Sequence, residues 1–491
     1  MDYNRGTVLI NFTSPMLRPW KLEIRLDHAS EKAIYLQIAD AIIADIQSGR
    51  LKSGDALPGS RNMAEMLHVN RNTVVEALNV LLNEEWIISK ERKGTFVANT
   101  LPAFSKEPRP HPIHTREYTP KDVYRIHFDD GYPDSKIAPV TELARAYRQI
   151  FNRHARWQMM GYGNEFGDPD FVNAIMQMLN HQRGMQVTRQ SICITRGSQM
   201  AMYLISQCMF KKGDFVVIEN PGYKAAWKAF ENSGATLLPT RVDRDGLIID
   251  DVVAHLKAHR RIKALYTTPH HQYPTTVTLS LQRRLELVKL SNEYGFTIIE
   301  DDYDNEFHFG YRPLLPLSSF PELENYVYIG TMSKVVAPAL RIGYLTSINH
   351  DLIREVGELR RIIDVQGDGI MEQAVLQLIN DGTIKRHIRK ATQYYKAKRD
   401  YVETLLNRYL RDVVDFVVPD GGLAFWIEPK AKVDWAEVSE RLKEESIKIL
   451  TPNYYSMDNS INGIRLGYGS LSEKDLTVGI KTLSKYLVQR R

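Results

Sequence analysis

The stretch Tyr326-Val-Tyr-Ile-Gly-Thr-Met-Ser-Lys334 decides the fold of the larger part of this chain. Its first four residues are β-branched or aromatic, which predicts a buried strand over residues 326–329. The four residues that follow predict a sharp turn that presents Lys334 at its end. An amine held at a strand end in a closed site can lose its proton and attack an aldehyde. Lys334 is therefore a candidate nucleophile, and the alternative is one of 64 basic side chains on a solvated loop.

A second apolar run, Gly295-Phe-Thr-Ile-Ile-Glu-Asp301-Asp302-Tyr303-Asp304, ends abruptly in acids. In an open α/β sheet, ligands bind beyond the carboxyl ends of the strands, so these acids are expected to face a site. A carboxylate there, Asp301, can keep a pyridine nitrogen protonated, and Tyr303 can donate to a phenolic oxygen on the same ring. Together with Lys334 they indicate pyridoxal 5'-phosphate. Taken alone, such a cluster equally fits a metal site or a solvated turn; we expect no metal.

A phosphate needs donors, and Ile192-Cys-Ile-Thr-Arg-Gly197-Ser198-Gln199 predicts a strand, a tight glycine turn and a helix start. Free backbone N–H groups at a helix start, with the Ser198 hydroxyl, form an anion cradle. We expect Gln199 to belong to this turn. Ser333 and Arg341 are expected to complete the cradle from the lysine loop.

Residues 126–490 resemble a fold-type I aminotransferase of the aspartate aminotransferase class. The matching words are Gly197-Ser-Gln199, Glu219-Asn-Pro-Gly-Tyr223, Thr268-Pro-His-His-Gln-Tyr-Pro-Thr275, Glu300-Asp-Asp-Tyr-Asp304 and Ser333-Lys334. The resemblance implies an α/β body with a large lobe at about residues 140–355 and a smaller C-terminal α/β lobe at about 356–490. It also implies that PLP forms a Schiff base with Lys334.

The same resemblance implies further roles. Tyr223 would stack on the cofactor ring, Arg465 would grip a substrate carboxylate, and Tyr162 would reach the partner's phosphate across a dimer interface. The competing interpretations are plain packing for the tyrosines and an exposed strand arginine. The family's usual Asn-Pro-Thr-Gly appears as Tyr273-Pro-Thr-Thr276, without the asparagine that bonds the ring oxygen. His271 or Gln272 either replaces that asparagine or only shapes the loop.

Composition sets broad limits. A chain of 491 residues with 43% hydrophobic residues is expected to form about two to four soluble globular domains. Its two cysteines and the lack of a secretory pattern favour the cytoplasm, and its longest apolar run is too short to span a bilayer. The net charge is +5, but residues 1–98 hold twelve basic and twelve acidic residues. Any binding of nucleic acid by this part must come from where its charges lie.

The region 32–98 has the pattern of a DNA-binding head. Ile34, Ile38, Ile42 and Ile46 predict an amphipathic helix. Ser60 is expected to cap a short helix that ends at Leu67, and Asn70 to cap a second helix over residues 71–83. Two short helices about a tight turn form a helix-turn-helix, whose second helix enters the major groove by its N-terminal end.

A basic glycine turn between two short strands, Trp86-Ile-Ile-Ser89 and Thr95-Phe-Val-Ala98, predicts a wing. With Leu57-Pro-Gly-Ser-Arg61, Asn70-Arg-Asn-Thr-Val74 and Lys93-Gly-Thr-Phe-Val97, the region resembles a GntR-type winged helix-turn-helix, mainly α with a small β wing. On that resemblance the residues placed on DNA are Arg61, Arg71, Asn72, Thr73, Lys93 and Gly94. Arg61 and Lys93 would hold phosphates, and the side chains of Arg71 and Asn72 can read base edges.

The remaining segments are an N-terminal arm, residues 1–31, with a possible strand over 7–12, and a linker over 99–125. The linker holds five prolines, at positions 102, 108, 110, 112 and 120, and has no hydrophobic period. Such a segment is expected to be semi-extended.

The combination of head, linker and body resembles the MocR/GabR family of bacterial transcriptional regulators. This implies a cytoplasmic homodimer, found on the nucleoid when bound to double-stranded DNA, that reads two half-sites. Its body would sense a small amino compound, or PLP itself, through Schiff-base chemistry at Lys334. The alternatives are a working PLP-dependent aminotransferase with an appended head, so enzymatic activity stays open, and a body that has lost PLP and only dimerises.

Overall fold

The computed structural model describes residues 24–91, 93–102, 124–152, 157, 160–310, 314–458 and 460–488. The possible strand over residues 7–12, most of the predicted arm and most of the predicted linker lie outside these residues. The chain divides into two compact units, a head and a body, and each is described by itself.

The head is built from three helices and a hairpin. Helix α1 (Ile34–Gln47), α2 (Ser60–Leu67) and α3 (Arg71–Asn83) enclose an apolar core that includes Ile38, Ile42, Val74 and Leu81, all fully buried. Strands β1 (Ile87–Lys90) and β2 (Gly94–Val97) pair antiparallel, with Lys90 opposite Gly94. The predicted helix-turn-helix and wing are confirmed.

The two predicted helix caps of the head have different outcomes. Asn70 caps α3, because its side chain accepts a hydrogen bond from the Asn72 N–H at 2.9 Å. The cap predicted at Ser60 is wrong. Gly59 occupies the extended cap position, and Ser60 is already the first helical residue of α2. The Ser60 hydroxyl instead lies 3.4 Å from the Arg71 Nε–H, which donates to it.

The body is built around an eight-stranded sheet in the order β4-β11-β10-β9-β8-β5-β6-β7. Its strands are β4 (Ile192–Thr195), β5 (Phe215–Asn220), β6 (Thr236–Asp243), β7 (Gly246–Leu247), β8 (Ile262–Thr267), β9 (Thr297–Asp302), β10 (Tyr326–Thr331) and β11 (Gly343–Ser347). The pairs from β10 through β6 are parallel, while β11 runs antiparallel to both β10 and β4.

Helices cover both faces of this sheet, so its central strands are almost continuously apolar. They are α4 (Val140–Asn152), α5 (Pro169–Arg183), α6 (Ser198–Met209), α7 (Lys224–Asn232), α8 (Ile249–Ala258), α9 (Leu281–Tyr294), α10 (His350–Ile363) and α11 (Gly369–Asn380). Along β10, Tyr326 and Tyr328 join the apolar cluster that includes α5, α9 and α11. Val327 and Ile329 join the cluster on the other face with α6, α7 and α10. The buried strand predicted at 326–329 is confirmed and runs two residues further.

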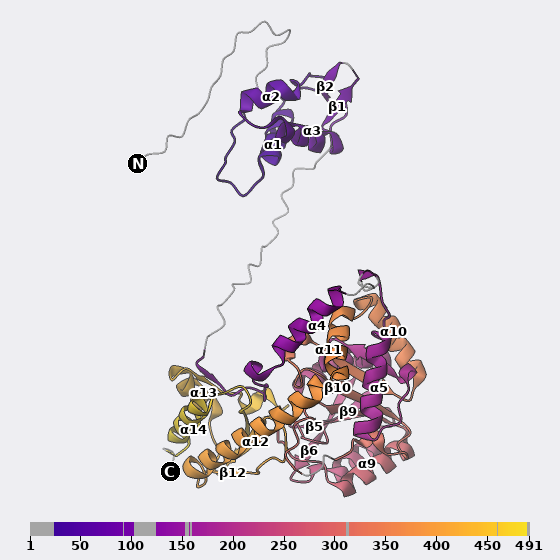
Figure 1. The fold of residues 1–491 in the computed structure, drawn as a ribbon, viewed down its shortest axis with the longest axis vertical. Helices are drawn as coiled ribbons and strands as arrows, with labels where there is room; N and C mark the ends of the chain where they lie inside the picture. Colours follow the sequence, from indigo (N-terminus) through magenta and orange to yellow (C-terminus); the bar gives the residue numbers. More distant parts are fainter. Residues whose placement is uncertain are drawn as a thin grey trace. The chain divides into compact units, whose positions relative to one another are not determined.

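A smaller lobe follows the long helix α12 (Thr383–Tyr409), which runs in Figure 1 from the α11 side of the body toward α13 and α14. Strands β12 (Val414–Phe416), β13 (Ala424–Pro429) and β15 (Ile464–Gly467) form an antiparallel sheet beneath α13 (Trp435–Glu444) and α14 (Glu473–Val488). Strand β14 (Ile447–Lys448) pairs in parallel with β3 (Ile126–His127). The first strand of the body is therefore tied to this C-terminal lobe.

The sheet brings the functional segments to one edge. Because β4, β5, β8, β9 and β10 point the same way, the turns after them meet beyond their carboxyl ends. The antiparallel strand β11 begins at this edge, with Gly343 paired to both Thr195 and Thr331. The glycine turn at Gly197 and the lysine loop after β10 are therefore neighbours.

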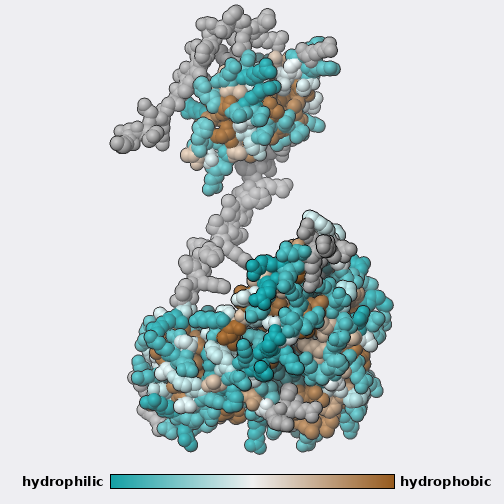
Figure 2. Space-filling model, in the orientation of Figure 1, coloured by the Kyte–Doolittle hydropathy of each residue, from teal (hydrophilic) through white to brown (hydrophobic). Residues whose placement is uncertain are grey.

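Hydrophilic side chains predominate on the face of the body that Figure 2 shows. Among the residues that the structure describes, no helix combines the length and apolar character needed to cross a bilayer.

Candidate functional site

Lys334 lies in the turn that ends β10. The Met332 N–H donates to the Ile342 carbonyl at 3.0 Å, and the Ser333 N–H donates to the Thr331 hydroxyl at 3.1 Å, so the turn is fixed from both sides. The Lys334 Nζ lies 4.5 Å from the centre of the Tyr303 ring. Burial lowers the pKa of Lys334, and the nearby Asp304 charge opposes that shift. A lowered pKa increases the share of neutral amine, which is the form that attacks an aldehyde.

Asp301 lies near the end of β9 and is almost fully buried. Its Oδ2 accepts a hydrogen bond from the Tyr266 hydroxyl at 2.8 Å, while its Oδ1 is buried without a partner. Burial raises the pKa of this carboxyl to about 7, although the bond from Tyr266 opposes the shift. A buried oxygen without a donor is costly, so Oδ1 is suited to receive an N–H from a bound ligand.

The neighbouring acids have structural roles. Glu300 accepts hydrogen bonds from the backbone N–H groups of Leu317 and Ser318. Asp302 accepts from the Tyr328 hydroxyl at 2.6 Å. Asp302 Oδ1 and Asp304 Oδ2 are also buried without a hydrogen bond, but each of these two carboxylates lies beside a histidine, at 3.4 Å from His270 and 2.7 Å from His271, and Asp301 forms no such pair among the described residues.

The glycine turn after β4 forms a concave backbone at the start of α6. Gly197 has φ 81° and ψ 169°, a conformation that is essentially restricted to glycine. Ser198 and Gln199 are the first two residues of α6, so their backbone N–H groups belong to the unpaired first turn. The Gln199 side chain itself points elsewhere, because its amide donates to the Ala225 carbonyl at 2.9 Å.

One group from the lysine loop, the Arg341 side chain, reaches the same turn. The Arg341 guanidinium packs against Gly197 so closely that a Cβ at position 197 would lie 2.9 Å from its Cζ, and its Nη2 donates to the Arg196 carbonyl at 3.1 Å. The Ser333 hydroxyl oxygen is buried and has no hydrogen-bond partner. Of the residues predicted for the phosphate, Arg341 is therefore brought to the turn at Gly197, and the phosphate role of the others stays a prediction.

Tyrosine rings line the space around Lys334. The Tyr223 ring packs edge-on against Tyr273 at 5.2 Å, and Tyr273 packs against Tyr303 at 6.2 Å. The Tyr303 hydroxyl donates to the His271 carbonyl at 2.9 Å. Stacking of Tyr223 on a cofactor ring, and donation from Tyr303 to that ring, stay predictions.

The loop that lacks the family's asparagine is held by its own side chains. The Gln272 amide donates to the Pro221 carbonyl at 2.9 Å and accepts from the Thr275 hydroxyl at 2.6 Å. His271 Nδ1 lies 2.7 Å from an Asp304 oxygen. Both side chains hold the loop in this structure, and replacement of the missing asparagine by either of them stays a prediction.

Arg465, on β15, is fully buried beside this loop. Its Nε donates to the Asp130 carbonyl at 3.2 Å, and its Nη1 donates to the Pro274 carbonyl at 2.9 Å. Its Nη2 lies 3.4 Å from the Tyr303 hydroxyl. Arg465 therefore lies next to the tyrosines that surround Lys334, with its donors directed to protein oxygens.

Tyr162 lies apart from these residues. Its side chain is 91% exposed, and the next residue, Gly163, is tied through its N–H to the Gln366 side chain. An exposed tyrosine is compatible with the predicted role across a dimer interface, which stays a prediction.

In the head, the residues predicted to contact DNA surround the start of α3 and the wing. Arg61, Arg71, Asn72, Lys93 and Gly94 are exposed, while Thr73 is half-buried. Gly94 opens β2 with φ 107°, which allows the tight turn of the wing. Exposure of basic and amide side chains at the N-terminal end of α3 is what base and phosphate contacts require.

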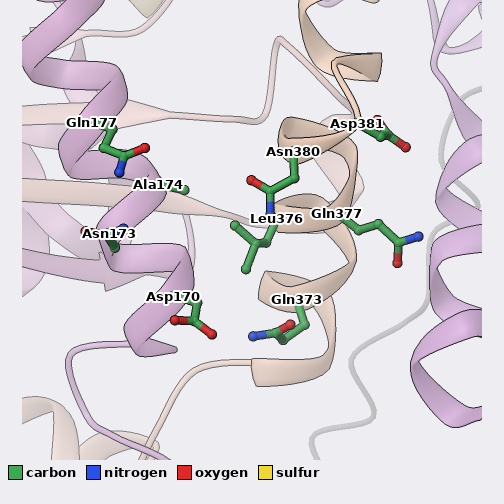
Figure 3. Close-up of a pocket in the computed structure, with 9 residues that line it drawn as sticks. All are labelled: Asp170, Asn173, Ala174, Gln177, Gln373, Leu376, Gln377, Asn380 and Asp381. Atoms are coloured by element: carbon green, nitrogen blue, oxygen red, sulfur yellow. The ribbon is translucent and has the colours of Figure 1, made fainter. Parts of the chain in front are cut away.

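A groove lies between α5 and α11 (Figure 3). Its walls are mostly amide side chains and two carboxylates: Asp170, Asn173, Ala174, Gln177, Gln373, Leu376, Gln377, Asn380 and Asp381. No residue predicted to bind the cofactor lines it. The described residues also hold no group of three or more His, Cys, Asp or Glu side chains that could hold a metal ion.

The arrangement around Lys334 fits pyridoxal 5'-phosphate. Asp301 Oδ1 lacks a donor that a protonated ring nitrogen would supply, and the Ser333 hydroxyl lacks a partner that a phosphate would supply. The Gly197 turn and Arg341 offer backbone and guanidinium donors for the same phosphate. Tyr266 and Asp130 have no local sequence signal, because their partners, Asp301 and Tyr273, lie far away along the chain.

Comparison with known proteins agrees with this geometry. Residues 130–483 match the family model "Aminotransferase class I and II", and residues 34–97 match "Bacterial regulatory proteins, gntR family". The probable rhizopine catabolism regulatory protein MocR of Rhizobium meliloti is 26% identical over 93% of this chain and 94% of its own length. The HTH-type transcriptional regulator TauR of Rhodobacter capsulatus is 26% identical, over 92% and 96%.

Among solved structures, a kynurenine aminotransferase of Pyrococcus horikoshii, in complex with PMP, superposes with a TM-score of 0.70. It is 26% identical and covers 75% of this chain and 92% of its own.

Proposed function

The chain belongs to the class I and II aminotransferase family and, through its gntR-type head, to the MocR-type regulators, and from this premise we propose how it works. It is a DNA-binding transcriptional regulator whose body holds pyridoxal 5'-phosphate and responds to a small amino compound. The observation that carries the proposal is the convergence of Lys334, the unpartnered Asp301 oxygen and the Gly197 turn on a chain that also carries a complete helix-turn-helix.

Each residue has a separate task in this proposal. When bound, pyridoxal 5'-phosphate would supply an aldehyde carbon, at which one amine can replace another. Lys334 supplies the resident amine, and its burial keeps a share of that amine neutral. Asp301 would orient the ring by accepting a hydrogen bond from its protonated nitrogen, while Ser333, Arg341 and the start of α6 would hold the phosphate.

An incoming amine that took the place of Lys334 would leave the lysine side chain as a free amine inside the body, beside the Tyr303 ring. A ligand can shift a protein between two arrangements only by interacting differently with each of them. We therefore expect the incoming amine to favour one arrangement of a homodimer, in which Tyr162 reaches the partner's phosphate. Two heads in a dimer read two half-sites on the duplex, with the start of α3 in the major groove.

The test measures DNA affinity and the visible spectrum of the cofactor in the same sample. Operator fragments are first selected from random duplex DNA with the cofactor-loaded full-length protein. A panel of amines is then titrated while DNA affinity and the visible spectrum are recorded. We expect one amine class to change both signals in wild-type protein, and we expect Lys334→Ala to lack the starting spectrum of a lysine Schiff base. Amines that change the spectrum and leave DNA binding unaltered would contradict the proposal.

The same panel separates a regulator from a working aminotransferase. We expect keto-acid or aldehyde formation well below roughly 1 per second, the low end of ordinary enzyme rates. Turnover at ordinary enzyme rates, with no selected operator, would favour the enzyme.

A further inference from the structure

The segment that carries Tyr162 lies against the end of α10. The Gln366 side-chain oxygen accepts from the Gly163 N–H, and Arg361 forms an ion pair with Glu165. These contacts fix the backbone directly after Tyr162. The Tyr162 side chain itself is 91% exposed, so the described part of the chain leaves its ring almost uncovered.

Gln366 reaches Gly163 through a rare turn of the backbone. The Gln366 N–H donates to the Asp364 carbonyl at 2.6 Å, which makes Val365 the centre of a three-residue turn. Val365 has φ 61°, a conformation that strains a β-branched residue. Such strain persists only where the surroundings fix the neighbouring residues, and it is concentrated at functional positions. The strained turn therefore points to a function for the side chain that it places, Gln366.

Asp364 anchors the other end of this turn. Its Oδ1 accepts from the Arg360 Nε at 3.3 Å, and Arg360 is fully buried. Its Oδ2 lies 3.2 Å from the Nε of Arg196, the residue before Gly197. One carboxylate thereby joins the end of α10 to the turn that is predicted to hold the phosphate.

We propose that Gln366 is a positioning residue for Tyr162. By accepting from the Gly163 N–H, it fixes the backbone from which the Tyr162 ring extends, so that the tyrosine hydroxyl reaches the cofactor phosphate of the partner subunit. The inference rests on the proposed function, in which Tyr162 has that role. Through Asp364, the same device ties Tyr162 to the phosphate turn of its own subunit.

The experiment titrates cofactor-free full-length protein with pyridoxal 5'-phosphate and records the visible spectrum. Gln366→Ala removes the acceptor and should weaken cofactor binding roughly three- to tenfold, as the loss of one hydrogen bond predicts. Gln366→Glu keeps an acceptor oxygen and should restore most of that loss. Gln282→Ala is the matched control on the surface of α9, where the amide donates to Glu286 at 3.0 Å. It should bind the cofactor as the wild type does.

Two further measurements separate positioning of Tyr162 from a general brace. In the Tyr162→Phe background, which lacks the hydroxyl, Gln366→Ala should weaken cofactor binding by less than about a further twofold, because the two residues act as one unit. Mixed dimers of Gln366→Ala chains and Lys334→Ala chains should hold one lysine-containing site of nearly wild-type affinity. The intact Tyr162 at that site then comes from the Lys334→Ala chain.

Equal weakening by Gln366→Ala with and without the Tyr162 hydroxyl would give Gln366 a structural role only and overturn the inference. The absence of a restored site in the mixed dimers would overturn it as well. If Tyr162→Phe weakens cofactor binding and Gln366→Ala does not, the inference fails while the proposed function stands. If wild-type protein gains no visible absorption band with the cofactor, both fail.

Discussion

Replacing Gly197 by alanine tests the phosphate cradle at its most constrained point. The residue has φ 81° and ψ 169°, where side chains other than hydrogen are strained by roughly 1–3 kcal/mol. The added Cβ would also lie 2.9 Å from the Arg341 Cζ, so the guanidinium must move away from the turn. The substitution thus perturbs the backbone donors and the arginine together.

The expected magnitude follows from these two effects. A charge-assisted hydrogen bond to a phosphate contributes roughly 1.5–3 kcal/mol. Loss of the Arg341 contact alone should therefore weaken cofactor binding roughly ten- to hundredfold. The free energy of unfolding should fall by roughly 1–3 kcal/mol from the backbone strain.

The matched control is Gly295→Ala. Gly295 has φ 71° and ends α9, and a Cβ there would meet nothing within 4 Å. This variant should lose roughly 1–2 kcal/mol of stability from its left-handed backbone and keep the cofactor affinity of the wild type. Spectral titration of cofactor-free protein measures the affinities, and denaturant unfolding measures the stabilities. Wild-type cofactor affinity in Gly197→Ala, or equal loss in both variants, would refute the assignment of the phosphate to this turn.

Three further substitutions test other parts of the account. Arg71→Ala should weaken binding to the selected operator by roughly 1–3 kcal/mol and binding to unrelated DNA by less, as measured by fluorescence anisotropy; equal affinity for the operator would reject α3 as the recognition helix. Burial raises the pKa of Asp301 to about 7. Its contribution to the stability of cofactor-free protein is thus complete below about pH 4 and is lost as the pH rises through about 7, by at most about 4 kcal/mol. Denaturant unfolding at about pH 5 and 8 should therefore show a smaller loss of stability in Asp301→Asn than in the wild type, and parallel profiles would count against a buried neutral acid. Tyr162→Phe should weaken cofactor binding roughly tenfold and leave the proposed homodimer intact when its mass is measured by sedimentation, whereas unchanged affinity would assign Tyr162 to the surface alone.

Local sequence signals were sufficient for the parts of the fold that are buried on both sides or carry a special backbone. The apolar run at 326–329 predicts β10 because a strand between two helical layers needs apolar side chains on both faces. Gly197 predicts its turn because few residues other than glycine adopt that conformation. Asn70 predicts the start of α3 because its capping hydrogen bond joins two residues that are only two positions apart, Asn70 and Asn72.

Other features depend on contacts between distant segments, which no local pattern records. The Tyr266 hydroxyl donates a hydrogen bond to Asp301 from a neighbouring strand. The Tyr273 hydroxyl donates to Asp130, which lies 143 residues away along the chain. The prediction that Ser60 caps α2 was wrong for a related reason. Gly59 and Ser60 both suit the cap position, and the cap falls to Gly59 while the Ser60 hydroxyl lies beside Arg71.

The measurement that tests the central claim most directly is chemical capture of the cofactor. The cofactor-loaded full-length protein is reduced with borohydride, digested and mapped by mass spectrometry. We predict the mass of the reduced cofactor on the peptide that contains Lys334, and on no other lysine peptide. Capture at a different lysine, or no capture at all, would contradict the account.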